Sequence, residues 1–170
     1  MKRLALLRHA KSSWHHHDVD DLGRPLNDRG WKAARRIGKE LKHRHMRFDL
    51  VIASTAARVR ETIDGVQEHF DFECEIRFEP ELYLASCESL FSMIAALPDS
   101  VKAPLLVGHN PGLQQLLFGL ARDDDPLRHR IAHKFPTGAL GLIALPADRW
   151  REIALSSGEI VDLILPKELD

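Results

Sequence analysis

The chain has 170 residues, of which 44% are hydrophobic and 29% are charged, and its formal net charge is −1. This length suits one domain with its own core, and a near-neutral chain lacks the basic surplus typical of proteins that bind nucleic acid or anionic membranes. The apolar runs are far shorter than the ~20 residues that cross a bilayer, and two cysteines are too few for a disulfide framework. We therefore expect a single domain over residues 1–170, located in the cytoplasm, with no nucleic-acid or membrane partner.

Short apolar runs alternate along the chain with segments whose apolar residues recur at helical spacing. Three such pairs follow one another: residues 4–7 with 31–41, residues 50–53 with 59–70, and residues 105–107 with 113–120. Between the second and third pairs, residues 75–78 predict a weak strand and residues 90–97 one face of a helix. Residues 122–136 predict a loop or short helix. The last predicted elements are two strands, residues 139–145 and 152–155, joined as a hairpin by a turn at residues 146–148.

The alternation predicts an α/β fold, a three-layer αβα sandwich with a mostly parallel central sheet, because unbroken apolar strands are buried on both faces. Ligands of such sheets bind beyond the carboxyl ends of the strands. The first apolar run ends in Arg8 and His9, the second in Ser54 with Arg58 four residues later, and the third leads into His109. Two arginines and two histidines at one sheet edge predict a phosphate site, since arginine forks and helix N-termini both favour phosphate oxygens.

These residues lie in segments that resemble the motifs of the histidine phosphatase superfamily, which includes the phosphoglycerate mutases. Residues 7–10 (LRHA) resemble its Arg-His-Gly motif, and residues 54–62 (STAARVRET) are similar to its Ser-Pro-x-x-Arg-Ala-x-x-Thr segment. Residues 107–110 (VGHN) match its second histidine, and residues 80–82 (PEL) fall where its catalytic acid is usually found. Ala10 stands in place of the usual glycine and Thr55 in place of the usual proline; neither change removes a charged or proton-carrying group.

Three further segments are similar to the SixA-type phosphohistidine phosphatases of this superfamily: residues 8–14 (RHAKSSW), 24–30 (RPLNDRG) and 135–139 (FPTGA). The resemblance covers the chain from Leu4 to about Leu155. It implies a phosphoglycerate mutase-like fold and a phosphatase that needs no metal or other cofactor.

The resemblance also implies a role for each site residue. Neutral His9 attacks phosphorus, with its second ring nitrogen held by a backbone carbonyl. Arg8, Arg58 and a protonated His109 stabilise the equatorial oxygens. Glu81 protonates the leaving group, although residues 80–82 also suit a simple turn. Ser12 and Asn110 are further candidates for contact with the phosphate, and Ser12 could equally cap the turn.

Other phosphate chemistries lack their motifs in this sequence. Neither Cys74 nor Cys87 has an arginine six positions later, which excludes the Cys-x5-Arg phosphatase loop, and the chain has no P-loop motif. The three histidines of residues 15–17 do not share one face of a helix or a strand, so we expect a polar loop there and no metal site.

The substrate is inferred from the space around the site. The stretch between Glu81 and His109 must hold a helix and a strand, which leaves no room for a substantial lid. An open pocket favours phosphohistidine displayed on a protein, so we expect a phosphohistidine carrier or phosphotransfer domain as partner. Two alternatives remain: a phosphatase of small phosphomonoesters, and a non-catalytic module that binds phosphorylated partners.

Overall fold

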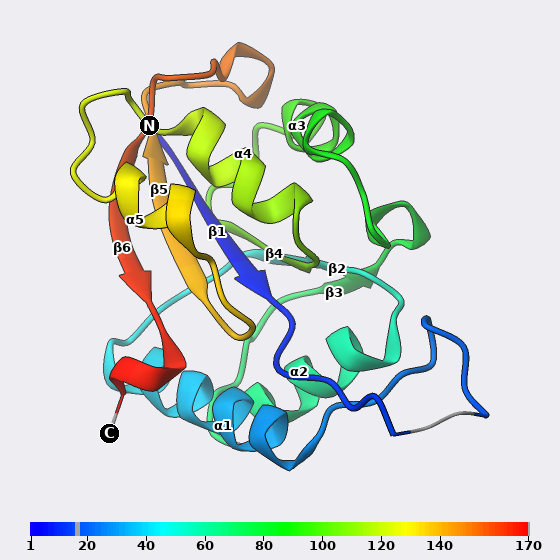
Figure 1. The fold of residues 1–170 in the computed structure, drawn as a ribbon. Coiled ribbons are helices and arrows are strands. Elements are labelled where there is room, and N and C mark those ends of the chain that lie inside the picture. Colours follow the sequence, from blue (N-terminus) through cyan, green and yellow to red (C-terminus); the bar gives the residue numbers. More distant parts are fainter. Residues whose placement is uncertain (16–17, 170) are drawn as a thin grey trace.

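A central sheet organises the protein, and the computed structural model describes it within residues 1–15 and 18–169 as six strands in the order β3-β2-β4-β1-β5-β6 (Figure 1). The strands are β1 (Lys2–Arg8), β2 (Leu50–Ala53), β3 (Ile76–Phe78), β4 (Pro104–Gly108), β5 (Leu140–Leu145) and β6 (Glu159–Ile164). The pairs β3–β2, β2–β4 and β4–β1 are parallel, whereas β5 is antiparallel to both β1 and β6. The predicted mostly parallel sheet is confirmed.

Helices cover both faces of the sheet. Figure 1 shows α1 (Asp28–His43) and α2 (Ala57–Gln67) on one side, and α3 (Cys87–Ala95), α4 (Gly112–Leu120) and α5 (Arg128–His133) on the other. The N-terminus of α1 is capped by the side chain of Asn27, which accepts a hydrogen bond from the backbone N–H of Gly30. The protein therefore has the three-layer αβα architecture expected from the sequence.

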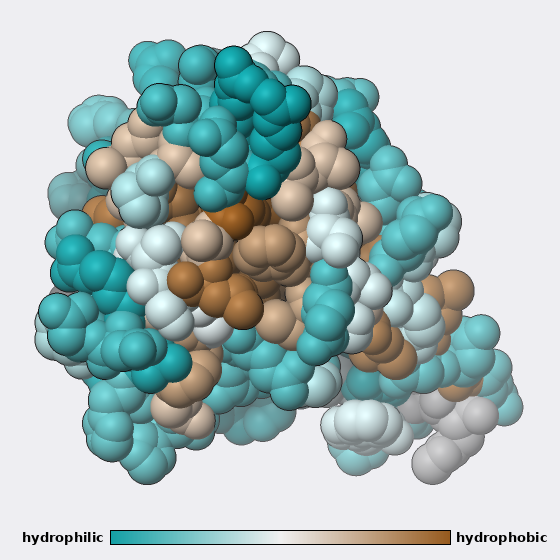
Figure 2. Space-filling model, turned by 90° about the horizontal axis from the view of Figure 1, so that it is seen from above, coloured by the Kyte–Doolittle hydropathy of each residue, from teal (hydrophilic) through white to brown (hydrophobic). Residues whose placement is uncertain are grey.

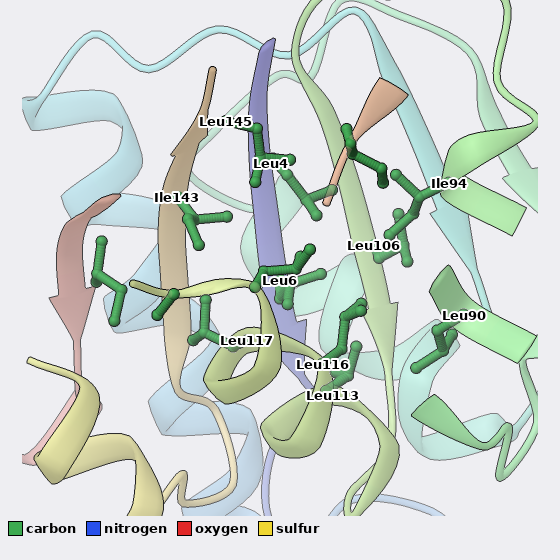
Figure 3. Packing of buried hydrophobic residues seen from close by; sticks show 14 of the residues in the cluster. Leu4, Leu6, Leu90, Ile94, Leu106, Leu113, Leu116, Leu117, Ile143 and Leu145 are labelled. Atoms are coloured by element: carbon green, nitrogen blue, oxygen red, sulfur yellow. The ribbon is translucent and has the colours of Figure 1, made fainter. Parts of the chain in front are cut away.

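The core forms two layers because successive side chains of a strand point to opposite faces. In β1, Leu4 and Leu6 face the α3–α4 side, whereas Ala5 and Leu7 belong to the layer under α1 and α2. Figure 3 shows the first layer, in which leucines of α4 pack against Leu6 and against Leu106 of β4. This two-sided burial explains why the parallel strands read as unbroken apolar runs.

The predicted strand at residues 152–155 is wrong. That region contains a short 3-10 helix, η2 (Trp150–Glu152), and the strand that pairs with β5 on the side away from β1 is β6, which the sequence pattern did not reveal. Trp150 is fully buried, and its indole N–H donates a hydrogen bond to the carbonyl of Val101 at 2.7 Å. This contact fastens the segment to the loop before β4, and the next extended segment of the chain pairs with β5.

The surface seen from above is mostly hydrophilic, with an apolar area near its centre (Figure 2). Within the described ranges, we find no helix that is both long and apolar enough to span a bilayer.

Three parallel strands end at the same edge of the sheet. The register places Arg8 of β1 beside Gly108 of β4, and Ala53 of β2 beside Val107 of β4. The residues that follow these strand ends, among them His9 and His109, are thereby brought together.

Candidate active site

A cavity of about 480 Å³ opens at this edge of the sheet. The segment between β1 and α1 forms a large part of its wall. The cavity is lined by Arg8, His9, Lys11, Ser12, Trp14, Asp21, Arg24, Arg58, Leu84, His109, Asn110 and Thr137. Of the residues that the sequence indicated, the structure brings Arg8, His9, Ser12, Arg58, His109 and Asn110 together here. Glu81 is not among the lining residues.

His9 is held as a neutral imidazole with one nitrogen available. Its side chain is buried, and Nδ1 lies 2.7 Å from the carbonyl oxygen of Ala10, which fixes the proton on Nδ1 and leaves the lone pair on Nε2. Burial lowers the pKa of His9 to about 3, assisted by positive charge on His109, Arg58 and Arg8 and opposed by the Ala10 hydrogen bond. At neutral pH Nε2 is therefore an unprotonated nitrogen able to act as a nucleophile.

Two backbone contacts fix the loop that carries His9. The hydroxyl of Thr62 accepts a hydrogen bond from the N–H of Ala10 at 2.9 Å and donates one to the carbonyl of Arg58 at 2.6 Å. From the other side, the N–H of Gly138 donates to the carbonyl of His9 at 3.0 Å. Gly138 has a φ of 79°, in the region that favours glycine. Thr62 thus couples the nucleophile loop to α2, a role that its place in residues 54–62 could have suggested.

The guanidinium of Arg58 enters the cavity from the first turn of α2. Arg58 is 2% exposed; its Nη1 donates to the carbonyl of Asp21 at 2.6 Å, and its Nη2 lies 3.1 Å from Asp21 Oδ2. Arg60 is exposed and lies over the ring of Phe78. The register expected for this helix, with Arg58 inward and Arg60 outward, agrees with this geometry.

Arg8 and Arg58 share a further property. Among the described residues, the buried Nε of Arg8 and that of Arg58 have no hydrogen-bond partner. A buried N–H without an acceptor is costly, so these two groups favour the arrival of a polyoxygen anion.

His109 is held between Ser54 and Arg58. Its Nε2 lies 2.8 Å from Ser54 Oγ, and its Nδ1 lies 3.4 Å from Arg58 Nη2. Burial, followed by the charge of Arg58, lowers the pKa of His109 to about 4. In the protein alone His109 is therefore neutral at pH 7, which differs from the protonated form expected from the sequence. A protonated His109 requires a negative partner such as a phosphate dianion.

Sequence reasoning missed three residues that meet at the cavity wall: Asp21, Arg24 and Tyr83. Nε and Nη2 of Arg24 each lie 3.3 Å from Asp21 Oδ1, and the Tyr83 hydroxyl donates to Asp21 Oδ2. The Tyr83 hydrogen bond, with the charge of Arg58, lowers the pKa of Asp21 to about 2. Asp21 is therefore ionised and links two arginines. Arg24 could have been found from its place in residues 24–30. No local pattern indicates the contact between Tyr83 and Asp21, which are 62 residues apart.

Three predicted site residues have positions that bear on their roles. Glu81 lies on η1 (Pro80–Leu82) and is exposed, whereas Tyr83 just after it reaches the site. The Ser12 hydroxyl accepts a hydrogen bond from Nη1 of Arg24. The amide of Asn110 donates to the carbonyl of Phe135 at 2.9 Å and to Gln114 Oε1 at 3.2 Å. Ser12 and Asn110 thus hold neighbouring groups in place at the cavity wall.

No group of three or more His, Cys, Asp or Glu side chains that could hold a metal ion is found within the ranges that the structure describes. His15 is exposed. His16 and His17, the other members of the histidine run, lie outside the described residues.

Comparisons with known proteins agree with this geometry. The family model of the histidine phosphatase superfamily (branch 1) matches residues 4–84. An uncharacterized protein of Mycobacterium leprae is 31% identical over 95% of this chain and 100% of its own length. Two solved structures are each named "putative phosphohistidine phosphatase SixA". The structure from Agrobacterium tumefaciens is 32% identical, with a TM-score of 0.82 over 97% of this chain and 98% of the other. The structure from Nakamurella multipartitia is 27% identical, with a TM-score of 0.83 over 97% and 96%.

The chain belongs to the histidine phosphatase superfamily, and its fold is similar to that of the two SixA structures. Its function is accordingly of the histidine phosphatase type.

Proposed function

We propose that this protein hydrolyses phosphate from phosphohistidine on a protein, through a covalent intermediate on His9. The observation that carries the proposal is the state of His9, a buried neutral imidazole whose Nδ1 is bonded to the Ala10 carbonyl and whose Nε2 is free. Around it stand three arginines, Arg8, Arg24 and Arg58. A neutral nucleophile among fixed cations suits attack on a phosphate dianion.

The reaction proceeds in two displacements. Nε2 of His9 attacks phosphorus in line, and the bond between phosphorus and the substrate's imidazole nitrogen breaks. Water then attacks the phosphorus on His9, the bond to Nε2 breaks, and inorganic phosphate leaves. The proton stays on Nδ1 throughout, hydrogen-bonded to the Ala10 carbonyl, so His9 leaves the phosphorus as a neutral imidazole. One proton of the water remains on the phosphate, and the other passes to solvent.

The arginines provide the charge stabilisation in both steps. The unpartnered Nε–H groups of Arg8 and Arg58 are donors available to the equatorial oxygens. Arg24 adds a third guanidinium, oriented by Ser12 and Asp21. Because these donors are held in place before the reaction, little reorganisation accompanies the transition state.

The acid–base groups of the cavity favour phosphohistidine over an ester. Asp21 is the carboxylate among the described lining residues, and with a pKa of about 2 it holds no proton to donate at neutral pH. An alkoxide leaving group needs such a proton. A phosphohistidine that is protonated on its ring needs no such proton. Its imidazole leaves as a neutral ring, whose conjugate acid has a pKa of ~6.5. Glu81 remains a proposed acid for esters, and would have to approach the cavity from η1.

The partner that follows is a protein phosphorylated on histidine, a carrier or a phosphotransfer domain. The test compares hydrolysis of a phosphotransfer domain phosphorylated on histidine with hydrolysis of a small phosphoester at matched concentration. We expect a higher kcat/KM on the phosphohistidine protein. A preference for the ester would favour the small-molecule alternative.

The intermediate gives a second test. Brief incubation with labelled substrate should leave phosphate on His9 that is stable in alkali and labile in acid. His9→Ala should abolish both label and turnover, whereas His129→Ala, at an exposed position of α5, should keep both. Label that persists in His9→Ala would refute the nucleophile assignment, and binding without any turnover in the parent would favour the non-catalytic alternative.

A further inference from the structure

Two exposed apolar side chains border the phosphate cavity. Trp14, from the segment between β1 and α1, is 73% exposed, and Leu84, from the loop after η1, is 55% exposed. We propose that Trp14 and Leu84 form an apolar mouth that binds the leaving-group side of the substrate, the imidazole ring of a phosphohistidine and the protein surface around it. This inference rests on the proposed function and names the residues that distinguish a protein substrate from a small one.

Trp14 is held in place although most of its surface is exposed. The guanidinium of Arg24 stacks on the indole, with its central carbon 3.6 Å from the ring centroid. Arg24 is itself buried and is bonded to Ser12 and Asp21. An exposed aromatic ring stacked on a buried, hydrogen-bonded arginine is pre-organised for contact, because little side-chain freedom remains to be lost on binding.

Leu84 shows a second, independent feature. Its φ of 51° lies in the left-handed region, which leucine rarely adopts, yet its side chain contributes little to the core. Because burial of the Leu84 side chain does not offset the strain of this backbone conformation, we take the strain as a sign of a role in binding. The residue before it, Tyr83, donates its hydroxyl to Asp21. Both sides of the mouth are thus connected to the same carboxylate, Trp14 through Arg24 and Leu84 through Tyr83.

The size and chemistry of the mouth select the occupant. A phosphate group bound to the arginines occupies the cavity floor and leaves both apolar side chains exposed to water. A small phosphorylated metabolite offers little surface to cover them, whereas a folded protein carrying phosphohistidine brings a flat ring and its neighbouring side chains. Imidazole can stack on the indole face opposite Arg24. The cationic floor and apolar mouth therefore match a phosphorylated ring on a protein surface.

The experiment measures kcat/KM on two substrates, a phosphotransfer domain phosphorylated on histidine and phosphoramidate, whose leaving group is ammonia. The variants are Trp14→Ala and Leu84→Gly; glycine removes the side chain and also suits the left-handed backbone, so the fold is retained. On the protein substrate we expect each variant to lose about tenfold in kcat/KM, which corresponds to about 1.4 kcal/mol. On phosphoramidate, whose ammonia leaving group offers no surface to Trp14 or Leu84, the same variants should lose clearly less than on the protein substrate. Leu155→Ala, an equally exposed leucine next to Gly119 and away from the cavity, is the matched control and should match the parent on both.

The outcomes separate this inference from the proposed function. Equal losses on both substrates would mean that Trp14 and Leu84 act only by supporting the phosphate site, and would overturn the inference. Parent-like activity of both variants on the phosphorylated domain would overturn it as well. A parent protein that hydrolyses phosphoramidate but not the phosphorylated domain would overturn the proposed function itself.

Discussion

Replacing His9 by glutamine removes a buried ring whose protonation differs between the folded and unfolded protein. The pKa of His9 is about 3 in the folded state and 6.5 when unperturbed, with burial as the main cause. Between these values the unfolded chain binds a proton that the folded protein does not. The contribution of His9 to the free energy of unfolding is therefore largest above pH 6.5 and is lost as the pH decreases toward 3. At pH 4.5, two pH units below the unfolded pKa, His9 alone lowers the free energy of unfolding by about 3 kcal/mol, at ~1.36 kcal/mol per unit.

Urea unfolding of the parent and of His9→Gln at pH 7.5 and pH 4.5 measures this contribution. We expect the parent to lose about 3 kcal/mol more than His9→Gln between the two pH values. His109, whose pKa is lowered to about 4, is present in both proteins, so its own contribution largely cancels in the difference. His129→Gln, at an exposed position of α5, serves as the control and should follow the parent. An identical pH dependence of the parent and His9→Gln would show that folded His9 takes up its proton as it does in the unfolded chain, and would refute the lowered pKa of His9.

Three further predictions concern activity. Arg58→Ala should lower kcat/KM by a factor on the order of 10²–10³, the usual cost of losing one such donor, while exposed Arg60→Ala should leave it unchanged; the reverse ranking would contradict the register of α2. Glu81→Gln should lower kcat/KM on a phosphohistidine protein by no more than about twofold and kcat/KM on an ester by more. Equal large losses on the two substrates would instead place Glu81 in a positioning role at the cavity. Activity should survive EDTA, because every proposed charge-stabilising group is a side chain; loss on chelation with recovery on adding a divalent ion would reveal a metal requirement.

The sequence by itself determined the parts of this protein that depend on local pattern. Unbroken apolar runs identified β1, β2 and β4, because a strand that is buried on both faces carries apolar side chains on both. Since the carboxyl ends of parallel strands meet at one edge, the residues after those runs, His9, Arg58 and His109, could be placed in one site before the fold was known.

Contacts between distant segments decided the rest. Residues 152–155 and β6 have similar local patterns, but the structure pairs β6 with β5, whereas Trp150, which precedes residues 152–155, is buried and donates to the carbonyl of Val101. Asp21 became part of the site through Tyr83 and Arg58, residues separated from it by 62 and 37 positions.

The charge state of the site likewise came from the tertiary structure. His109 was expected to be protonated from its place in the motif, but its burial beside Arg58 keeps it neutral in the protein alone. Glu81 follows the motif in sequence and yet lies exposed on η1, because the turn of that short helix directs Tyr83 to Asp21 instead. The sequence thus placed these groups at one edge of the sheet. Desolvation and long-range hydrogen bonds, which no local pattern encodes, decided which of the groups carry protons and which face the cavity.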